Sequence, residues 1–214
     1  MNAEMREDRV SLIVTEFNLP LAVVRFNRPA ERNVLSENVR AQLEETLSKL
    51  TARRDVRAII FTGTGDVFSA GADIRELLSL TSTTARDFAH RGQRLMRRIA
   101  EAPQVTIAAI NGYCMGGGLD LALACDLRVA GPEAIFAHPG VALGIITGWG
   151  GTQRLPRIIG PARALEIILT ARRIAAREAL EIGLVNCLAT EPLEEARSIA
   201  RKIIDEWDSE ERPR

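Results

Sequence analysis

Several residue types are scarce in this sequence, and each scarcity excludes a class of protein. The 214 residues include three cysteines and two histidines, and no two cysteines have C-x-x-C spacing. A structural zinc site needs four ligands of these types, so no metal site is expected. No apolar stretch approaches the roughly 18 residues of a membrane-spanning helix, and residues 1–8 lack the apolar core of a signal peptide. We therefore expect a cytoplasmic protein without a membrane partner.

A surplus of one charge is also absent. Lysine and arginine together number 28, as do aspartate and glutamate, and the only lysines are Lys49 and Lys202. Domains that bind nucleic acid usually carry a basic excess, so nucleic acid is not expected as a partner. The hydrophobic fraction of 46% is that of an ordinary soluble protein. The composition predicts one domain that can bury its core without disulfides or metals.

Apolar runs and helical spacing alternate along the chain. Short apolar runs predict strands at residues 10–17, 21–27, 56–62, 104–110, 127–130 and 184–188. Spacing of three and four, or a preceding cap, predicts helices at residues 37–53, 85–101, 119–124, 161–170, 175–182 and 193–208. Ser36 is the expected cap of the first helix, and residues 81–84 are the expected cap of the second.

This alternation predicts an α/β fold. Residues 1–9 are expected to form a flexible N-terminus and residues 10–190 the core domain. Residues 191–214 are expected to form a C-terminal helix and a charged tail.

Two segments combine an extended stretch, glycines and the start of a helix. They are Phe68–Ile74 (FSAGADI) and Asn111–Asp120 (NGYCMGGGLD). Glycine permits left-handed backbone angles and close approach of a ligand. A helix that begins at such a turn directs unpaired N–H groups outward. Two such turns in one domain predict an oxyanion hole if they converge on a single oxygen atom.

Other phosphate-binding and nucleophilic motifs are missing. Gly112 precedes Gly116 by four residues, so the G-x-G-x-x-G fingerprint is absent, and neither lysine follows a glycine as a P-loop requires. Ser69 follows Val67 and Phe68 and does not fit G-x-S-x-G. Covalent nucleophilic catalysis is therefore not indicated.

The two glycine segments resemble the signatures of the enoyl-CoA hydratase/isomerase, or crotonase, family. Three further blocks match this family in the expected order: Arg28-Pro29 with Asn33, the run Gly150–Pro156 (GGTQRLP), and Glu178-Ala179 with Gly183-Leu184-Val185. Together the blocks span roughly residues 10–205. Agreement across five ordered blocks identifies the chain as a member of this family.

The resemblance implies a crotonase-like spiral of ββα units with C-terminal helices, assembled as a homotrimer or hexamer. It implies an acyl-CoA substrate whose thioester oxygen lies between the backbone N–H groups of Ala72 and Gly117. No metal or redox cofactor is expected, because coenzyme A is part of the substrate. The residues expected to contact the substrate are Ala70, Asp73, Ile74, Gly116, Gly140 and Trp149.

The acids depart from the family pattern. The family's two catalytic glutamates correspond here to Asp120, which keeps a carboxylate, and to Gly140, which has no side chain. General acid–base catalysis contributes about a hundred- to ten-thousand-fold per group. His138 is a candidate acid or base in place of the second glutamate, because in an extended chain it would share a face with Gly140. Asp73 and Glu76 suit the first turn of a helix better than catalysis.

The residues leave several reactions open. Hydration of an enoyl-CoA and movement of its double bond fit the resemblance best. Decarboxylation or thioester hydrolysis in the same fold needs fewer carboxylates, and a noncatalytic acyl-CoA-binding subunit is the alternative from another class. Family members usually continue for several dozen residues past the Gly-Leu-Val block, whereas this sequence has one more helix. We therefore expect an acyl site that is more open or is covered by a neighbouring subunit.

Overall fold

The computed structural model describes residues 11–210. The strands are β1 Ile13–Asn18, β2 Leu21–Phe26, β3 Ala58–Gly63, β4 Val67–Ser69, β5 Val105–Ile110, β6 Tyr113–Met115, β7 Leu127–Ala130, β8 Ile135–Ala137, β9 Ile174–Ala175 and β10 Cys187–Leu188. The α-helices are α1 Glu37–Thr51, α2 Ile74–Leu78, α3 Ser82–Ala100, α4 Gly117–Ala124, α5 Gly151–Ile159, α6 Pro161–Thr170, α7 Ala176–Glu181 and α8 Pro192–Glu210. Two 3-10 helices are η1 Pro29–Glu31 and η2 Pro139–Leu143.

The strands form two sheets built by a repeated unit. The larger sheet has the order β1-β2-β3-β5-β7-β10, and the smaller has the order β4-β6-β8-β9. A strand of the larger sheet is followed by a strand of the smaller one and then by a helix, as in β3-β4-α2, β5-β6-α4 and β7-β8-η2-α5. Within the larger sheet β2, β3, β5, β7 and β10 are parallel. The predicted spiral of ββα units is therefore confirmed.

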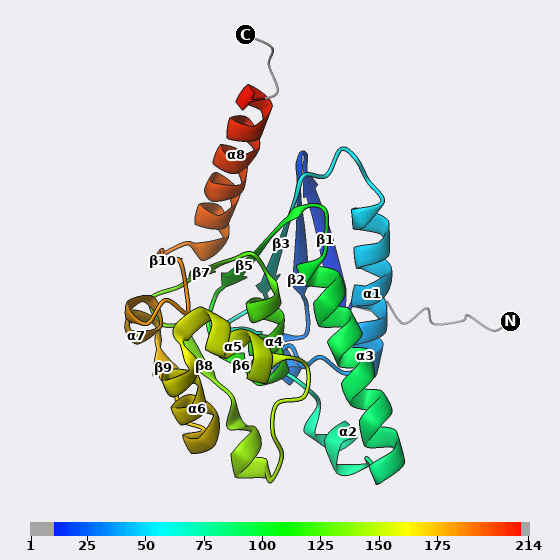
Figure 1. Ribbon diagram of the computed structural model, residues 1–214. Helices are drawn as coiled ribbons and strands as arrows, with labels where there is room; N and C mark the ends of the chain where they lie inside the picture. Colours follow the sequence, from blue (N-terminus) through cyan, green and yellow to red (C-terminus); the bar gives the residue numbers. More distant parts are fainter. Residues whose placement is uncertain (1–10, 211–214) are drawn as a thin grey trace, which may run out of the picture.

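Both faces of the larger sheet are buried. Ile59 and Phe61 of β3 face one hydrophobic cluster, which includes the apolar residues of α1, α3 and α4. Ala58 and Ile60 face a second cluster together with residues of α8. This alternation follows from the two-residue period of a strand, and coverage on both faces explains the continuous apolar runs. Figure 1 shows α1 and α3 side by side on one side of the strands and α8 on the other.

Both helices begin at the predicted cap positions, but only one of the two caps makes the expected side-chain hydrogen bonds. Thr81 and Thr84 form a reciprocal capping box at the start of α3. Ser36 is the N-cap residue of α1, but its side chain makes no capping hydrogen bond. Within residues 11–210 no helix combines the length and the apolar character that crossing a membrane requires.

Most predicted elements are confirmed and some are wrong. The hairpin of β1 and β2 is present, and α6 has the predicted bounds. The strand predicted at residues 184–188 is reduced to Cys187–Leu188, and β4, β6 and β9, of two or three residues each, were not predicted. The extended chain expected at residues 138–140 is instead the start of η2. Residues 1–9 and the end of the charged tail lie outside the described residues.

Candidate active site

A cavity of about 250 Å³ lies where the two glycine segments meet. Its walls come from α2, α3, the start of α4 and the segment that joins β8 to α5. The lining residues are Ala70, Ala72, Ile74, Leu77, Ala85, Phe88, Ala89, Gly116, Gly117, Asp120, His138, Pro139, Gly140, Leu143, Ile145, Ile146, Thr147, Gly148 and Trp149. Most of these side chains are apolar, which suits an acyl group.

The structure brings the N–H groups of Ala72 and Gly117 together at this cavity. Gly71 has a φ of +87°, and a Cβ on it would lie 2.7 Å from the Gly117 nitrogen. A Cβ on Gly117 would lie 3.3 Å from the Ala72 nitrogen. Among the described residues neither N–H donates to a protein acceptor. Two unpaired donors that converge in this way are suited to one oxyanion.

Two side chains from the matched sequence blocks, Ser69 and Asn33, hold the first of these turns in place. The Ser69 hydroxyl donates to the Asn33 carbonyl over 2.8 Å and accepts from the Gly71 N–H over 3.1 Å. The buried Asn33 side chain donates to the carbonyls of Val67 (2.6 Å) and Thr64 (3.0 Å). The opening block of the sequence therefore fixes the turn that presents the Ala72 N–H.

Asp120 is the only carboxylate among the described residues that line the cavity. It lies one turn after Gly117 on α4 and is 1% exposed. The Thr147 hydroxyl donates to its Oδ2 over 2.6 Å, and its Oδ1 has no hydrogen-bond partner. Burial raises the pKa of the Asp120 carboxyl, while His138 and the Thr147 hydrogen bond act in the opposite direction. A raised pKa makes this carboxyl a stronger base when it is ionised than an ordinary aspartate.

His138 lies beside Asp120. Its Nε2 is 3.8 Å from Oδ1 of Asp120, and both of its ring nitrogens are buried without a hydrogen-bond partner. Burial lowers the pKa of His138, and Asp120 partly offsets this. The prediction that His138 and Gly140 share a face of an extended chain is wrong, because residue 138 precedes a 3-10 helix.

The position of the missing glutamate has little room for a side chain. A Cβ on Gly140 would lie 2.9 Å from the carbonyl oxygen of Ile145. The Ile145 N–H donates back to the Gly140 carbonyl over 3.0 Å. A tight turn therefore occupies the space into which a residue at position 140 would extend.

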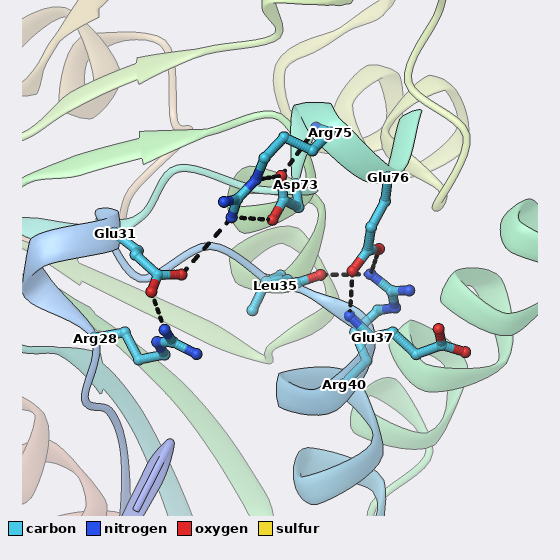
Figure 2. A network of polar contacts seen from close by, with 8 residues as sticks. All are labelled: Arg28, Glu31, Leu35, Glu37, Arg40, Asp73, Arg75 and Glu76. Atoms are coloured by element: carbon cyan, nitrogen blue, oxygen red, sulfur yellow. Dashed lines mark hydrogen bonds and ion pairs between the residues drawn. The ribbon is translucent and has the colours of Figure 1, made fainter. Parts of the chain in front are cut away.

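Five of the six residues expected to contact substrate line the cavity: Ala70, Ile74, Gly116, Gly140 and Trp149. Asp73 does not line it. Its carboxylate caps α2 through the Arg75 N–H and pairs with the Arg75 guanidinium, which lowers the pKa of Asp73. Figure 2 shows this pair, and also Glu76 turned toward Arg40 and α1. Asp73 and Glu76 therefore act as residues of the first turn of a helix, as predicted, and not as catalytic acids.

Thr147 is the functional candidate that the sequence did not reveal. No motif marks it, because its partner Asp120 lies 27 residues earlier in the chain. Among residues 11–210 no three histidine, cysteine, aspartate or glutamate side chains are grouped so that they could hold a metal ion.

Comparison with known proteins agrees with this geometry. The sequence model of the enoyl-CoA hydratase/isomerase family matches residues 16–212. The chain belongs to this family. It is 41% identical over 195 residues to the crotonyl-CoA hydratase of Syntrophomonas wolfei, and this alignment covers 90% of this chain and 75% of that protein. It is 42% identical over 200 residues to a probable enoyl-CoA hydratase of Bacillus subtilis, with 92% of this chain and 76% of that protein covered.

Solved structures show the same fold. The crystal structure of an enoyl-CoA hydratase from Bacillus anthracis superposes with a TM-score of 0.87 at 38% identity, over 91% of this chain and 77% of that one. Pseudomonas aeruginosa DspI superposes with a TM-score of 0.87 at 33% identity, over 95% and 84%. The crotonase fold of this family member is thus shared along nearly all of its length.

Proposed function

We propose that this family member acts on an acyl-CoA thioester and either adds water to an enoyl-CoA or shifts its double bond. The observation that carries the proposal is the convergence of the Ala72 and Gly117 N–H groups in a cavity that also holds the buried Asp120 carboxyl. The two N–H groups would bind the thioester oxygen and stabilise the enolate. Removal of one such donor typically reduces the rate by about a hundred- to a thousand-fold.

Asp120 is proposed to move the proton. In hydration its carboxylate takes a proton from water, the hydroxyl group bonds to the β-carbon, and the π electrons move to the thioester oxygen. The enolate then collapses as a proton is delivered to the α-carbon. In isomerisation the same carboxylate removes a proton from one carbon and returns it to another. His138 is the proposed second proton carrier because it lies 3.8 Å from Asp120 and lines the same cavity.

The test is turnover of crotonyl-CoA by the purified protein, followed by loss of the enoyl-thioester absorbance and by identification of the product. Asp120→Asn keeps the shape of the side chain and removes the base. We expect this variant to lose about a hundred- to ten-thousand-fold in kcat. Turnover that is unchanged in Asp120→Asn contradicts the assignment of Asp120.

Among the described residues no second carboxylate lines the cavity, which favours two other candidate reactions. Decarboxylation of a malonyl-type CoA or hydrolysis of the thioester needs the oxyanion donors but fewer acids. The same preparation is therefore assayed for release of CO₂ and of free thiol. If acyl-CoA binds and none of these substrates turns over, the chain is a noncatalytic acyl-CoA-binding subunit.

The expected absence of a cofactor also belongs to this proposal. Every step above uses protons, backbone donors and the substrate thioester, so no metal or redox group is required. We expect the rate to be unchanged after treatment with a chelator. A rate that falls with chelation and returns with a divalent metal would contradict this.

A further inference from the structure

The indole of Trp149 lies directly against the oxyanion turn. It is 3% exposed and lines the cavity. A Cβ on Gly117 would lie 2.6 Å from Cε3 of the indole, and a Cβ on Gly92 of α3 would overlap its other edge. Glycines on two different helices therefore leave the space that this ring fills. The indole ring is therefore a closely packed part of the cavity wall.

Trp149 and Phe88 together close one end of the cavity. Their ring centroids are 5.3 Å apart, and both residues line the cavity and are buried. The loop that carries Trp149 is fixed on both sides: Gln93 of α3 donates to the Gly148 carbonyl over 2.9 Å, and Arg154 of α5 donates to the Trp149 carbonyl over 3.3 Å. The aromatic pair is therefore held in place by neighbouring helices.

A buried charge lies behind this aromatic pair. The Arg40 guanidinium is 5.0 Å from the Phe88 ring centroid and 5.4 Å from that of Trp149. It also donates to Glu76 over 3.0 Å and to the Leu35 carbonyl, as Figure 2 shows. An acyl chain that extended beyond the two rings would contact the ion pair of Arg40 and Glu76. It would separate the guanidinium from its hydrogen-bond partners and would offer no polar group in their place.

We propose that Trp149, supported by Phe88, sets the depth of the acyl pocket and restricts the bound substrate to short acyl groups. This inference rests on the proposed function only in that the ligand is an acyl-CoA. It adds the substrate class and the residue that selects it. Removal of the indole would open the pocket toward Gly92 and Arg40 and admit longer chains.

The test uses saturated acyl-CoAs, which lack the double bond, so that binding is measured without hydration or isomerisation. Calorimetry gives the Kd of butyryl-, hexanoyl- and dodecanoyl-CoA for the wild-type protein, for Trp149→Leu and for Trp207→Leu. The wild type should bind the two short ligands at least about tenfold more tightly than dodecanoyl-CoA, the lower end of what a hydrophobic pocket discriminates. Trp149→Leu should remove or reverse this ranking, with a gain of up to about fourfold for each methylene newly buried.

Trp207→Leu is the matched control. Trp207 lies on α8, is 41% exposed and stacks on Arg57 outside this cavity, so its loss should leave the ranking unchanged. Trp149→Phe keeps an aromatic ring beside Phe88 and should give an intermediate ranking. If circular dichroism shows that Trp149→Leu does not fold, the binding measurements on Trp149→Phe test the proposal instead.

The outcomes separate this inference from the proposed function. If the wild type binds dodecanoyl-CoA as tightly as butyryl-CoA, or if the folded Trp149 variants keep the wild-type ranking, the inference is overturned. If the ranking is as expected but crotonyl-CoA and the other substrates are not turned over, the proposed reaction fails and the role of Trp149 stands.

Discussion

At the residue scale, the buried Asp120 carboxyl, the proposed acid and base, is expected to reduce the stability of the fold. Its carboxyl is 1% exposed, and its Oδ1 has no hydrogen-bond partner among the described residues. Because burial raises the pKa above the value of 3.8 in an unfolded chain, the folded state favours the protonated form. The stabilising contribution is therefore complete below the unfolded pKa and is lost as the pH rises through the folded one. Above its folded pKa, ionised Asp120 therefore destabilises the fold.

Asp120→Asn should therefore stabilise the protein at pH 7 and above while it lowers kcat. The amide imitates the protonated carboxyl, and removal of a buried, incompletely paired charge should raise the free energy of unfolding by about 1–3 kcal/mol. Denaturant unfolding from pH 4 to pH 9 measures this, and the advantage of the variant should shrink as the pH falls. Asp126→Asn is the control, because Asp126 accepts hydrogen bonds from the N–H and hydroxyl of Thr106 and should lose stability at pH 7.

Thr147 is expected to orient Asp120 and to set its proton affinity. Its hydroxyl donates to Oδ2, so the other oxygen is left for a reacting proton. Thr147→Val has the same shape without the donor and should reduce kcat by about ten- to a hundred-fold, in line with the 1.5–3 kcal/mol of a hydrogen bond to a charged group. Because this hydrogen bond lowers the pKa of Asp120, its loss should move the acid limb of the pH–kcat profile to higher pH. Thr147→Ser should keep both properties.

The pH profile separates this role from simple packing. A ¹³C-NMR titration of the Asp120 carboxyl gives the same comparison without turnover. A valine variant that is slower but has an unshifted acid limb would mean that Thr147 only packs against the site.

At the scale of elements, the loop between β2 and α1 determines the shape of the oxyanion turn. Asn33 has a φ of +51°, a left-handed angle that asparagine tolerates better than most residues. Its side chain accepts from the Arg28 N–H and donates to the carbonyls of Thr64 and Val67, which flank the start of β4. Loss of these bonds frees β4 and, with it, the turn at Gly71.

Asn33→Ala should therefore destabilise the protein and impair the site together. Several buried groups lose their partners, which predicts a loss of about 2–4 kcal/mol, beyond the ~1 kcal/mol of one ordinary hydrogen bond. Thermal denaturation measures the first effect and kcat for crotonyl-CoA the second. Asn38→Ala on α1 is the control, since the Asn38 side chain makes none of these contacts to β4 and should leave both measurements close to wild type. A large loss of stability with unchanged kcat would separate Asn33 from the oxyanion turn.

The sequence predicts elements in proportion to their length. β3 and β5 are runs of six buried residues, and α3 has both an apolar stripe and a capping box, so composition alone located them. β4, β6 and β9 have two or three residues, too few to show a period of two, and they form only because β4 and β6 extend from strands already placed in the larger sheet. The end of η2 depends on a turn closed by Ile145, which no local pattern predicts.

In the candidate site, too, local features could be predicted from the sequence and contacts between distant residues could not. The two glycine segments were recognisable because they are local motifs, whereas the roles of the Ala72 and Gly117 N–H groups follow from the family resemblance and stay predictions. The contact between Thr147 and Asp120 and the seat of the Trp149 indole against Gly92 were not predictable, because each joins residues far apart in the sequence.

At the scale of the whole molecule, one wall of the cavity faces outward. The segment from η2 to the start of α5 lines the cavity through Leu143, Ile145 and Ile146, and each of these side chains is at least 44% exposed. Leu165 and Leu169 of the adjoining α6 are each 59% exposed. Large exposed apolar side chains on two adjoining elements favour a surface that another protein covers.

The family resemblance implies a homotrimer or hexamer, and we expect that a neighbouring copy covers this segment. Leu165→Glu with Leu169→Glu places two charges on the exposed face of α6 and should convert the oligomer to monomer. Because both side chains are exposed in the single chain, the fold of each monomer should survive, as circular dichroism would show. Light scattering coupled to gel filtration should give three or six chain masses for the wild type and one for the variant.

Activity then links this assembly to the site. If the neighbouring copy closes the cavity wall, the monomeric variant should show a raised KM for crotonyl-CoA and a smaller change in kcat, because Asp120 and the backbone donors belong to a single chain. Leu19→Glu, in the turn between β1 and β2, adds a charge at a similarly exposed leucine and should stay oligomeric and active. A wild type that is monomeric yet fully active would show that the outward-facing wall works uncovered, and the oligomer expected from the family would then not apply to this chain.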